Sequence, residues 1–501
     1  MLEQIARHFE INAGRPAIFI ESRFFSYAEL SEKVAAIQAE IEAREPCANT
    51  IIGVVLHSDF ETYASLLAIL FSGNGYLPIN PTSPSDRNIN VLHQAGARLL
   101  LSSDRAGFDK LSTALPLLGL VSTRQVSPID SKPIFRAVPQ SHYAYLLFTS
   151  GSTGIPKGVP ISRGNLDAFL TGFFDAGISM DENDRVLQMF ELTFDFSVMS
   201  CFAPWVVGAC LYPAAANELK FMSVYRLLEE QEITVAPMVP SALAFLRPFF
   251  GEIRLESLRY SVFCGEPLLA DIAREWAECT PNSTLFNFYG PTEATVFCSY
   301  YRWSPARQKA HNGALAIGKP MLHSKMKICD ENRVIQPPNQ SGEICLAGAH
   351  LTSGYWNAPE KNQESFFLME VDGQTERFYR TGDLGYLDDE GDFLFQGRLD
   401  QQVKVQGFRI ELTEIEHHAR ACPGVKQAVA AALPVRDGNN ELVLCLEDFQ
   451  GDVADVIHAL KGKLPAYMLP ARVELMAAFP LNKNGKIDRP AIRLHLAPKS
   501  A

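Results

Sequence analysis

The 501-residue sequence lacks the cysteine patterns that bind metals or cross-link secreted domains. Its ten cysteines are scattered between Cys47 and Cys445, with no C-x-x-C pair and no zinc-ligand spacing. Scattered cysteines in a chain of this length are typical of reduced thiols in a cytoplasmic protein. The N-terminus lacks the basic and apolar regions of a signal peptide, and no apolar run reaches the roughly 18–20 residues that span a bilayer. We therefore expect a cytoplasmic location without membrane insertion.

The sequence also lacks a basic run, and its formal net charge is -12 at pH 7. An acidic chain without a basic patch repels the phosphates of nucleic acids, so we expect no nucleic-acid partner. The composition, 47% hydrophobic and 20% charged, is typical of globular domains. A chain of this length can bury large cores and fold into more than one domain.

A loop rich in glycine and hydroxyl residues follows an apolar stretch, Tyr143 to Phe148, which is predicted to be a buried strand. Glycines let backbone N–H groups approach an anion closely, while hydroxyls and a lysine add donors and charge. The loop is not a Walker A motif, because Pro156 precedes Lys157 and Gly158 follows it. A flexible surface turn is the alternative, but this composition directly behind a strand favours a phosphate site. The candidate residues are Thr149, Ser150, Gly151, Ser152, Thr153, Gly154 and Lys157.

Apolar runs alternate with amphipathic segments over most of the chain, which predicts an α/β fold with parallel sheets covered by helices. Ile51 to Leu56, for example, is predicted to be a strand and Phe60 to Leu70 a helix. From about Gly342 onward, short apolar runs separated by turns indicate antiparallel hairpins. The end of the chain predicts a smaller unit of mixed helices and strands. We place the domain boundary in the polar stretch around Asp400, which divides the chain into residues 1–399 and 400–501.

Five further segments carry residue types that suit a nucleotide. An aromatic face can stack on a base, and a carboxylate can bind Mg²⁺ or accept the hydroxyls of a ribose. Each segment alone is weak evidence, because a lysine in a glycine turn, for example, is usually only solvated. The segments are Asn287 to Glu293, Tyr379 to Asp383, Gly397 to Asp400, Lys404 to Glu411 and Asn484 to Arg489.

Together and in this order, the loop and the five segments resemble one family over nearly the whole chain. The chain is similar to the adenylate-forming ligases, which include acyl-CoA synthetases, luciferases and the adenylation domains of peptide synthetases. The resemblance implies a large N-terminal core with a small β-barrel-like part, and a small mobile C-terminal α+β domain. It implies ATP and Mg²⁺ as cofactors and a reaction in two steps. A carboxylate first attacks the α-phosphate of ATP to give an acyl-adenylate and pyrophosphate, and a thiol then displaces AMP.

The resemblance also assigns roles to single residues. The glycine-rich loop is expected to hold the β- and γ-phosphates. Lys486 is expected to bridge the substrate carboxylate and the α-phosphate, where its charge opposes the charge that builds on phosphorus. Together with Lys486, the expected catalytic residues are Thr292, which reaches the α-phosphate, and Glu293, which binds Mg²⁺. The remaining nucleotide contacts are expected from Asn287 and Tyr289 at adenine and from Asp383 and Arg398 at the ribose.

In this family the C-terminal domain rotates between the two steps. The resemblance makes Asp400 the hinge of that rotation. The rotation brings Lys486 to the site for the first step and removes Lys486 from the site for the second. Lys404 and Gly407 then lie on the face that is presented in the thioester step.

The segment Phe194 to Ser197 resembles the part of amino-acid-activating members that holds the α-ammonium of the substrate. Asp195 supplies the anion for that contact, which a fatty or aryl acid does not need. A helix-capping role for Asp195 is the alternative. By resemblance the rest of the pocket is lined by Phe196, Met199, Pro237, Val262, Cys264, Phe288, Val296 and Phe297. These bulky side chains without a second charge predict a small uncharged amino acid as substrate.

The subfamily that the sequence resembles most is the D-alanine:D-alanyl carrier protein ligases, together with stand-alone amino-acid adenylation enzymes. Cys264, in the segment Val262 to Glu266, stands where those ligases place a pocket cysteine, and the segment Leu412 to Cys422 is also alike. The bulky residues Phe196, Phe288 and Phe297 depart from the D-alanine pattern, so the sequence leaves open whether the substrate is a D- or an L-amino acid.

The acceptor of the second step is expected in trans, because only thirteen residues follow Asp488. A separate carrier protein with phosphopantetheine is the first choice and coenzyme A the second. Two other hypotheses stay open at this point. An acyl-CoA synthetase for a small acid would not need Asp195, and a catalytically silent nucleotide-binding protein would be expected to lose Lys486 or Glu293.

Overall fold

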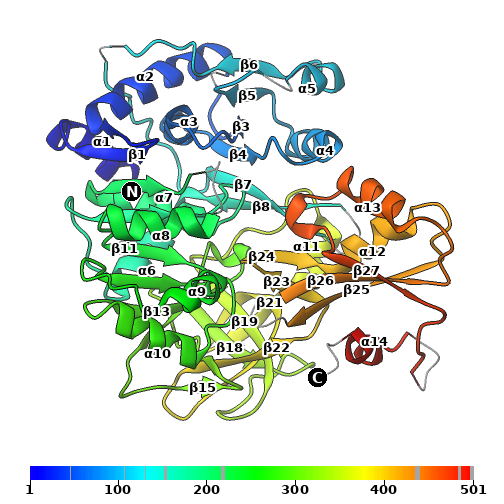
Figure 1. Ribbon diagram of the computed structural model, residues 1–501. Helices are drawn as coiled ribbons and strands as arrows, with labels where there is room; N and C mark the ends of the chain where they lie inside the picture. Colours follow the sequence, from blue (N-terminus) through cyan, green and yellow to red (C-terminus); the bar gives the residue numbers. More distant parts are fainter. Residues whose placement is uncertain are drawn as a thin grey trace.

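The computed structural model (Figure 1) describes residues 1–45, 47–105, 108–129, 131–151, 155–215, 220–434, 440–482 and 487–496. A six-stranded sheet lies at the top of Figure 1 in blue and cyan, and a nine-stranded sheet, mainly green, lies below it. Parallel strands alternate with covering helices in both sheets. The α/β fold that the sequence predicts is therefore confirmed.

The six-stranded sheet has the strand order β6-β5-β3-β4-β7-β8. All residues of β3 are buried, as the apolar run at Ile51 predicts for a strand that is covered on both faces. Strand β8 pairs antiparallel with β7, so the glycine-rich loop connects two neighbouring strands at one edge of the sheet. The strands are β3 (Ile51–Val55), β4 (Gly75–Ile79), β5 (Leu99–Ser102), β6 (Gly119–Ser122), β7 (Tyr143–Thr149) and β8 (Lys157–Ser162).

The nine-stranded sheet has the order β17-β14-β13-β12-β11-β9-β10-β1-β2, with a parallel centre and antiparallel pairs at both edges. Its strands are β1 (Pro16–Ile20), β2 (Arg23–Ser26), β9 (Arg185–Gln188), β10 (Cys210–Pro213), β11 (Val235–Met238), β12 (Tyr260–Phe263), β13 (Thr284–Tyr289), β14 (Ser299–Trp303) and β17 (Lys319–Pro320). A short ribbon of β15 (Ala310–His311) and β16 (Ala314–Leu315) lies beside it.

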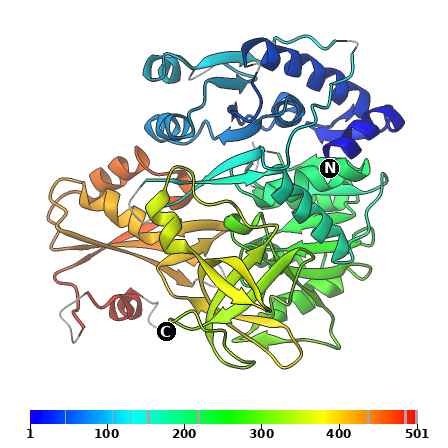
Figure 2. The same ribbon diagram turned by 180° about the vertical axis from the view of Figure 1, so that it is seen from behind.

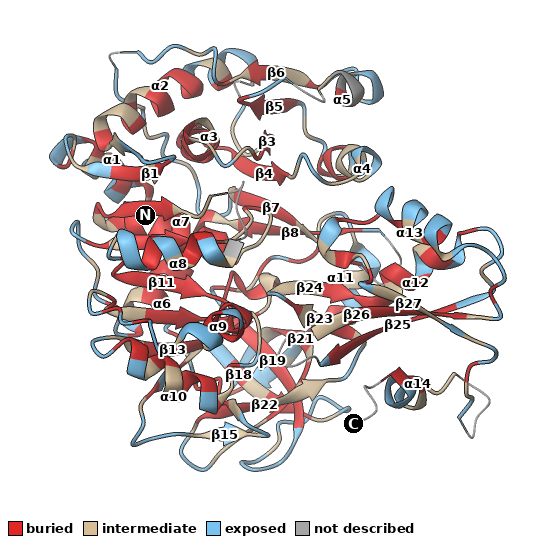
Figure 3. Cartoon of the chain, in the orientation of Figure 1, coloured by how far each residue is buried: buried red, intermediate tan, exposed pale blue. Residues whose placement is uncertain are grey.

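The largest hydrophobic core lies between the two sheets and takes residues from both of them and from helices α3, α6 and α7. The outer helices α8 and α10 turn an exposed face to solvent and a buried face to the sheet (Figure 3). None of the helices in the described part of the chain has the length and apolar character needed to cross a bilayer. The helices of this region are α1 (Leu2–Ile11), α2 (Tyr27–Arg44), α3 (Phe60–Phe71), α4 (Ser85–Ala95), α5 (Phe108–Ala114), α6 (Arg163–Asp175), α7 (Phe196–Val207), α8 (Lys220–Glu230), α9 (Pro240–Leu246), α10 (Ala270–Cys279) and α11 (Pro359–Ser365).

The hairpins expected after Gly342 form a five-stranded antiparallel sheet. This sheet is open, whereas the resemblance implied a barrel-like part. In Figure 2 it lies between the green sheet and the orange C-terminal part. Its strands are β18 (Ser324–Cys329), β19 (Gly342–Gly348), β20 (Phe366–Val371), β21 (Gln374–Leu387) and β22 (Phe393–Arg398).

The end of the chain forms a smaller α+β unit with two hydrophobic clusters of its own. A two-stranded hairpin of β23 (Gln402–Val405) and β24 (Phe408–Glu411) points from this unit toward the rest of the molecule. The separate clusters are consistent with the boundary at Asp400, which stays a prediction. The other elements are α12 (Leu412–Arg420), β25 (Gln427–Pro434), β26 (Asn440–Glu447), α13 (Val453–Lys461), β27 (Arg472–Met476) and α14 (Arg489–Leu496).

Candidate active site

The glycine-rich loop begins at the end of β7 and returns into β8, where Thr149 pairs with Lys157. Ser150 and Gly151 are buried, and Lys157 is largely buried. The expected phosphate ligands Ser152, Thr153 and Gly154 lie outside the described residues. The described part of the loop therefore offers a backbone N–H group, a hydroxyl and an ammonium at one end of the six-stranded sheet.

Carboxylates of the C-terminal unit contact these same donors. Gly151 N donates to Glu414 Oε2 at 3.1 Å, and Lys157 Nζ lies 3.5 Å from Glu411 Oε1. Ser150 Oγ donates to the carbonyl of Arg409 at 3.0 Å and accepts from Glu411 N at 3.2 Å. In this arrangement the β23–β24 hairpin and the start of α12 occupy the loop with negative charge, as phosphates would.

Arg409, at the same hairpin, reaches the expected magnesium ligand. Its Nη1 donates to Glu293 Oε2 at 2.8 Å, and Tyr355 OH donates to Glu293 Oε1 at 2.7 Å. Burial alone would raise the pKa of Glu293, but the Arg409 charge and these hydrogen bonds outweigh it and lower the pKa to about 2. Both carboxylate oxygens are thus engaged, and Glu293 fits a metal ion only when Arg409 withdraws.

The expected adenosine contacts line a larger cavity of about 910 Å³ between the core and the C-terminal unit. Asn287 and Tyr289 are two apart on β13 and therefore share a face of the strand. Asn287 Nδ2 donates to Ala316 O at 2.9 Å, while the buried Oδ1 has no hydrogen-bond partner among the described residues. An unpaired buried acceptor is costly, so this atom is suited to a donor such as the amino group of adenine.

Asp383 lies next to Tyr289 and Arg398 in this cavity. Its Oδ2 accepts from Tyr289 OH at 2.6 Å and its Oδ1 from Arg398 Nη1 at 2.6 Å. Arg398 Nε also donates to the expected hinge residue Asp400 at 2.7 Å. The cavity volume lies in the range of cofactor sites, roughly 300–1,000 Å³, and the donor set suits a nucleoside.

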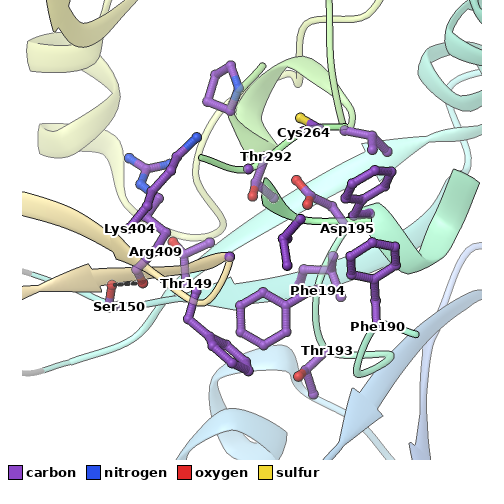
Figure 4. A pocket seen from close by; sticks show the side chains of 18 of the residues that line it. Thr149, Ser150, Phe190, Thr193, Phe194, Asp195, Cys264, Thr292, Lys404 and Arg409 are labelled. Atoms are coloured by element: carbon purple, nitrogen blue, oxygen red, sulfur yellow. Dashed lines mark hydrogen bonds between the residues drawn. The ribbon is translucent and has the colours of Figure 1, made fainter. Parts of the chain in front are cut away.

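A second, smaller cavity of about 110 Å³ lies at the N-terminal end of α7. Figure 4 shows Asp195, Thr292 and Cys264 on one side of it, with Lys404 and Arg409 of the hairpin on the other. Of the expected pocket residues, Asp195, Phe196, Cys264 and Val296 line this cavity.

Another group of expected pocket residues lies in the layer behind the cavity wall rather than on its surface. Phe297 packs edge-on against Phe196, with ring centroids 5.8 Å apart, and lies 4.3 Å from the ring of Phe288. Because these rings are buried and packed against one another, the cavity wall cannot move back to make room for a larger side chain. The residues in this layer are Met199, Pro237, Val262, Phe288 and Phe297.

The backbone that presents Val296 is unusual. Thr295 and Val296 have φ angles of 54° and 71°, a left-handed conformation that strains β-branched residues. Thr295 Oγ1 donates to the carbonyl of His350, which helps to hold the turn. The turn directs Val296 to the cavity wall directly after the 3₁₀ turn Thr292–Ala294.

Asp195 precedes α7, but within the described chain its carboxylate makes no capping hydrogen bond to that helix. Burial raises the pKa of Asp195 to about 6, although a hydrogen bond from Thr292 and the Lys404 charge lower it in part. Burial also raises the pKa of Cys264 to about 12, which keeps it a neutral thiol. The cavity therefore places Asp195 beside a neutral thiol and apolar side chains on one side (Figure 4). The other charged residues that line it are Glu191, Asp383, Arg398, Lys404 and Arg409.

Some residues of the site were not expected from the sequence. Arg409 stands in one of the quoted segments, yet nothing local indicates that it pairs with Glu293. Tyr467 and Phe190 also line the small cavity, and Glu266 contacts the hairpin. The expected catalytic residue Lys486 lies outside the described residues, so its role stays a prediction.

Comparison with known proteins identifies the family. A sequence-family model described as AMP-binding enzyme matches residues 5–356. D-alanine--D-alanyl carrier protein ligase of Bacillus cereus (strain AH187) is 30% identical over 512 residues, covering 98% of this chain and 98% of that protein. Tyrocidine synthase 3 of Brevibacillus parabrevis is 32% identical over 483 residues, covering 95% of this chain. The chain spans only 7% of the length of that synthase.

Solved structures show the same fold. Holo-PA1221, described as an NRPS protein containing adenylation and PCP domains, has a TM-score of 0.86 at 26% identity and covers 98% of this chain and 83% of its own. The Vibrio cholerae adenylation domain AlmE has a TM-score of 0.86 at 23% identity, covering 99% of this chain and 97% of its own. The chain therefore belongs to the AMP-binding enzyme family.

Proposed function

We propose that this enzyme activates a small uncharged amino acid, with D-alanine as the first candidate, and transfers it to the phosphopantetheine thiol of a separate carrier protein. The observation that carries the proposal is Asp195 in the wall of the small cavity beside Cys264. A buried carboxylate without a capping role is costly unless a cation pairs with it, and the α-ammonium of an amino acid supplies that cation. With the hairpin docked the cavity measures about 110 Å³, and the packed rings of Phe196 and Phe297 at its wall favour a small side chain.

The comparisons do not separate D-alanine from other small amino acids. The relative named for D-alanine matches this chain end to end, whereas the tyrocidine synthase matches it at a similar identity over a small part of its own length. A stand-alone adenylation enzyme for a small L-amino acid is therefore the second candidate. The cytoplasmic location and the absence of a nucleic-acid partner stay predictions.

In the proposed first step, a carboxylate oxygen of the amino acid bonds to the α-phosphorus of ATP, and pyrophosphate leaves with the electron pair of the broken P–O bond. Asn287, Tyr289, Asp383 and Arg398 would position the nucleoside in the larger cavity. Thr292 and Lys486 would oppose the charge that develops on the α-phosphate. Once Arg409 has withdrawn, Glu293 would hold Mg²⁺, which when bound supplies charge neutralisation for the phosphates.

The structure has the C-terminal hairpin docked on the core, and this docked arrangement suits the proposed second step. The hairpin that carries Lys404 and Gly407 faces the small cavity, and carboxylates fill the phosphate loop. ATP would need the same donors, so the C-terminal unit would have to leave the loop before the next first step, turning about Asp400. While the hairpin is docked, the thiol of the carrier would attack the acyl carbon, and AMP would leave as the new thioester forms.

The substrate can be tested by amino-acid-dependent exchange of labelled pyrophosphate into ATP. We expect the strongest exchange with D-alanine, the first candidate, among D-alanine, L-alanine, glycine, serine and proline. Exchange with propionate should be weak, because propionate has no ammonium to pair with Asp195. Preference for an L-amino acid would favour the second candidate. Exchange with propionate alone would exclude the amino-acid proposal.

Lys486→Ala tests the first step. We expect the rate of pyrophosphate exchange to fall by on the order of 100–1,000-fold, because the charge that faces the transition state is removed. Transfer to a thiol that starts from synthetic aminoacyl-adenylate should stay within about twofold, since Lys486 is removed from the site in the second step. Lys426→Ala, a change at an exposed lysine paired with Asp448, is the matched control. Exchange that survives the loss of Lys486 would contradict the proposed mechanism.

The raised pKa of Asp195 predicts a pH dependence. The carboxylate must be ionised to pair with the ammonium, and a group with a pKa of about 6 loses its charge as the pH falls through 6. We expect kcat/KM for the amino acid to fall about tenfold per pH unit below 6, because this quantity reports the free enzyme. Asp195→Asn should lower kcat/KM by on the order of 100-fold and flatten the profile. A profile that is the same in both proteins would assign the titration to another group.

Competition at the phosphate loop gives a further test. Magnesium pyrophosphate should displace Glu411 and Glu414 and so raise amide hydrogen–deuterium exchange over residues 402–411 by about fivefold. AMP lacks the β- and γ-phosphates and should leave the exchange of this segment unchanged. Equal exchange with pyrophosphate, with AMP and without ligand would show that phosphates and carboxylates do not compete.

A further inference from the structure

The tip of the β23–β24 hairpin has a left-handed backbone conformation, which favours glycine. Val405 pairs with Phe408, and the two residues between them, Gln406 and Gly407, have φ angles of 51° and 81°. Two central residues with positive φ are typical of a type I′ turn, which suits the twist of a two-residue hairpin. The tip is therefore a compact turn that presents the N–H group of Gly407 to the core.

A glutamate of the N-terminal core binds this tip. Glu266 Oε1 accepts from Gly407 N at 2.8 Å, and its Oε2 accepts from Ser241 N at 2.9 Å. Glu266 follows β12 and stands two residues after Cys264 in the wall of the small cavity. One carboxylate thus connects the hairpin tip to the core at the edge of the substrate cavity.

The rest of the tip fits the core closely. A Cβ atom on Gly407 would lie 2.6 Å from Val239 Cγ1, so only glycine can be seated here without a shift. On the other side of the tip, Phe408 stacks on Tyr467 at 4.3 Å and meets the ring of Phe194 edge-on at 4.4 Å. Phe194 directly precedes Asp195, so the seated hairpin touches the segment that holds the proposed ammonium site.

We propose that Glu266 is a positioning residue for the second step: it seats the hairpin tip over the acyl-adenylate site and has no part in adenylation. This inference rests on the two-step function proposed above. The bond from Ser241 lies within the core and persists wherever the C-terminal unit stands. The bond from Gly407 exists only when the hairpin is docked, and hydrogen bonds to an ionised acceptor are the strong ones. Glu266 therefore stabilises the docked arrangement selectively.

Glu266→Gln is the informative change because it keeps the size of the side chain. An amide has one oxygen in place of two, so it can accept from Ser241 N or from Gly407 N, and its NH₂ group faces the other donor. We expect amide hydrogen–deuterium exchange over residues 402–411 of the free enzyme to rise about fivefold. Transfer of the activated amino acid to free pantetheine should fall about tenfold, which corresponds to roughly 1.4 kcal/mol, while pyrophosphate exchange stays within about twofold.

Asp330→Asn is the matched control. Asp330 Oδ1 also accepts two backbone N–H groups, from Asn332 at 2.9 Å and Val334 at 2.8 Å, but both belong to the same turn of the core. This change should leave the hairpin segment and both half-reactions as in the wild type.

Three results would overturn the assignment of Glu266. They are unchanged amide exchange of the hairpin in Glu266→Gln, equal loss of pyrophosphate exchange and thiol transfer, and the same effect from Asp330→Asn. A wild-type enzyme without amino-acid-dependent activity would refute the proposed function instead. The amide exchange of the hairpin would in that case still decide whether Glu266 holds the tip.

Discussion

The donors at the end of β7 are already engaged by the C-terminal unit. Gly151 N–H, Lys157 and Ser150 contact Glu414, Glu411 and the backbone of β24 in the structure. In the proposed function the phosphates of ATP would need the same groups, and a donor that is fully engaged by a carboxylate cannot also bind them. Docking of the C-terminal hairpin and binding of ATP would then exclude each other.

The same constraint governs the charge on Glu293. A buried carboxylate is stable only when a cation lies beside it, because desolvation would otherwise neutralise it. Arg409 supplies that cation in the docked arrangement. In the proposed first step, a metal ion that accompanies the phosphates would take the place of Arg409 beside Glu293.

The hairpin contacts the chain near the small cavity at two places, Phe194 and Glu266. Phe194 packs against the hairpin and its neighbour Asp195 lines the cavity. Glu266 binds the hairpin tip two residues after Cys264, which also lines the cavity. The docked hairpin therefore contacts the two chain segments that carry Asp195 and Cys264.

Local sequence patterns determined the elements and the kinds of residues at the site. The strand at Ile51 and the strand from Tyr143 that leads into the glycine-rich loop follow from neighbours in the chain, and the structure agrees with both. Contacts between distant segments were decided only by the tertiary structure. Arg409 meets Glu293 across 116 positions, and the split of the expected pocket into a lining layer and a supporting layer depends on how α7 packs against β13 and its turn. No local pattern encodes these contacts, because they arise from docking of the C-terminal unit and from packing between sheets and helices.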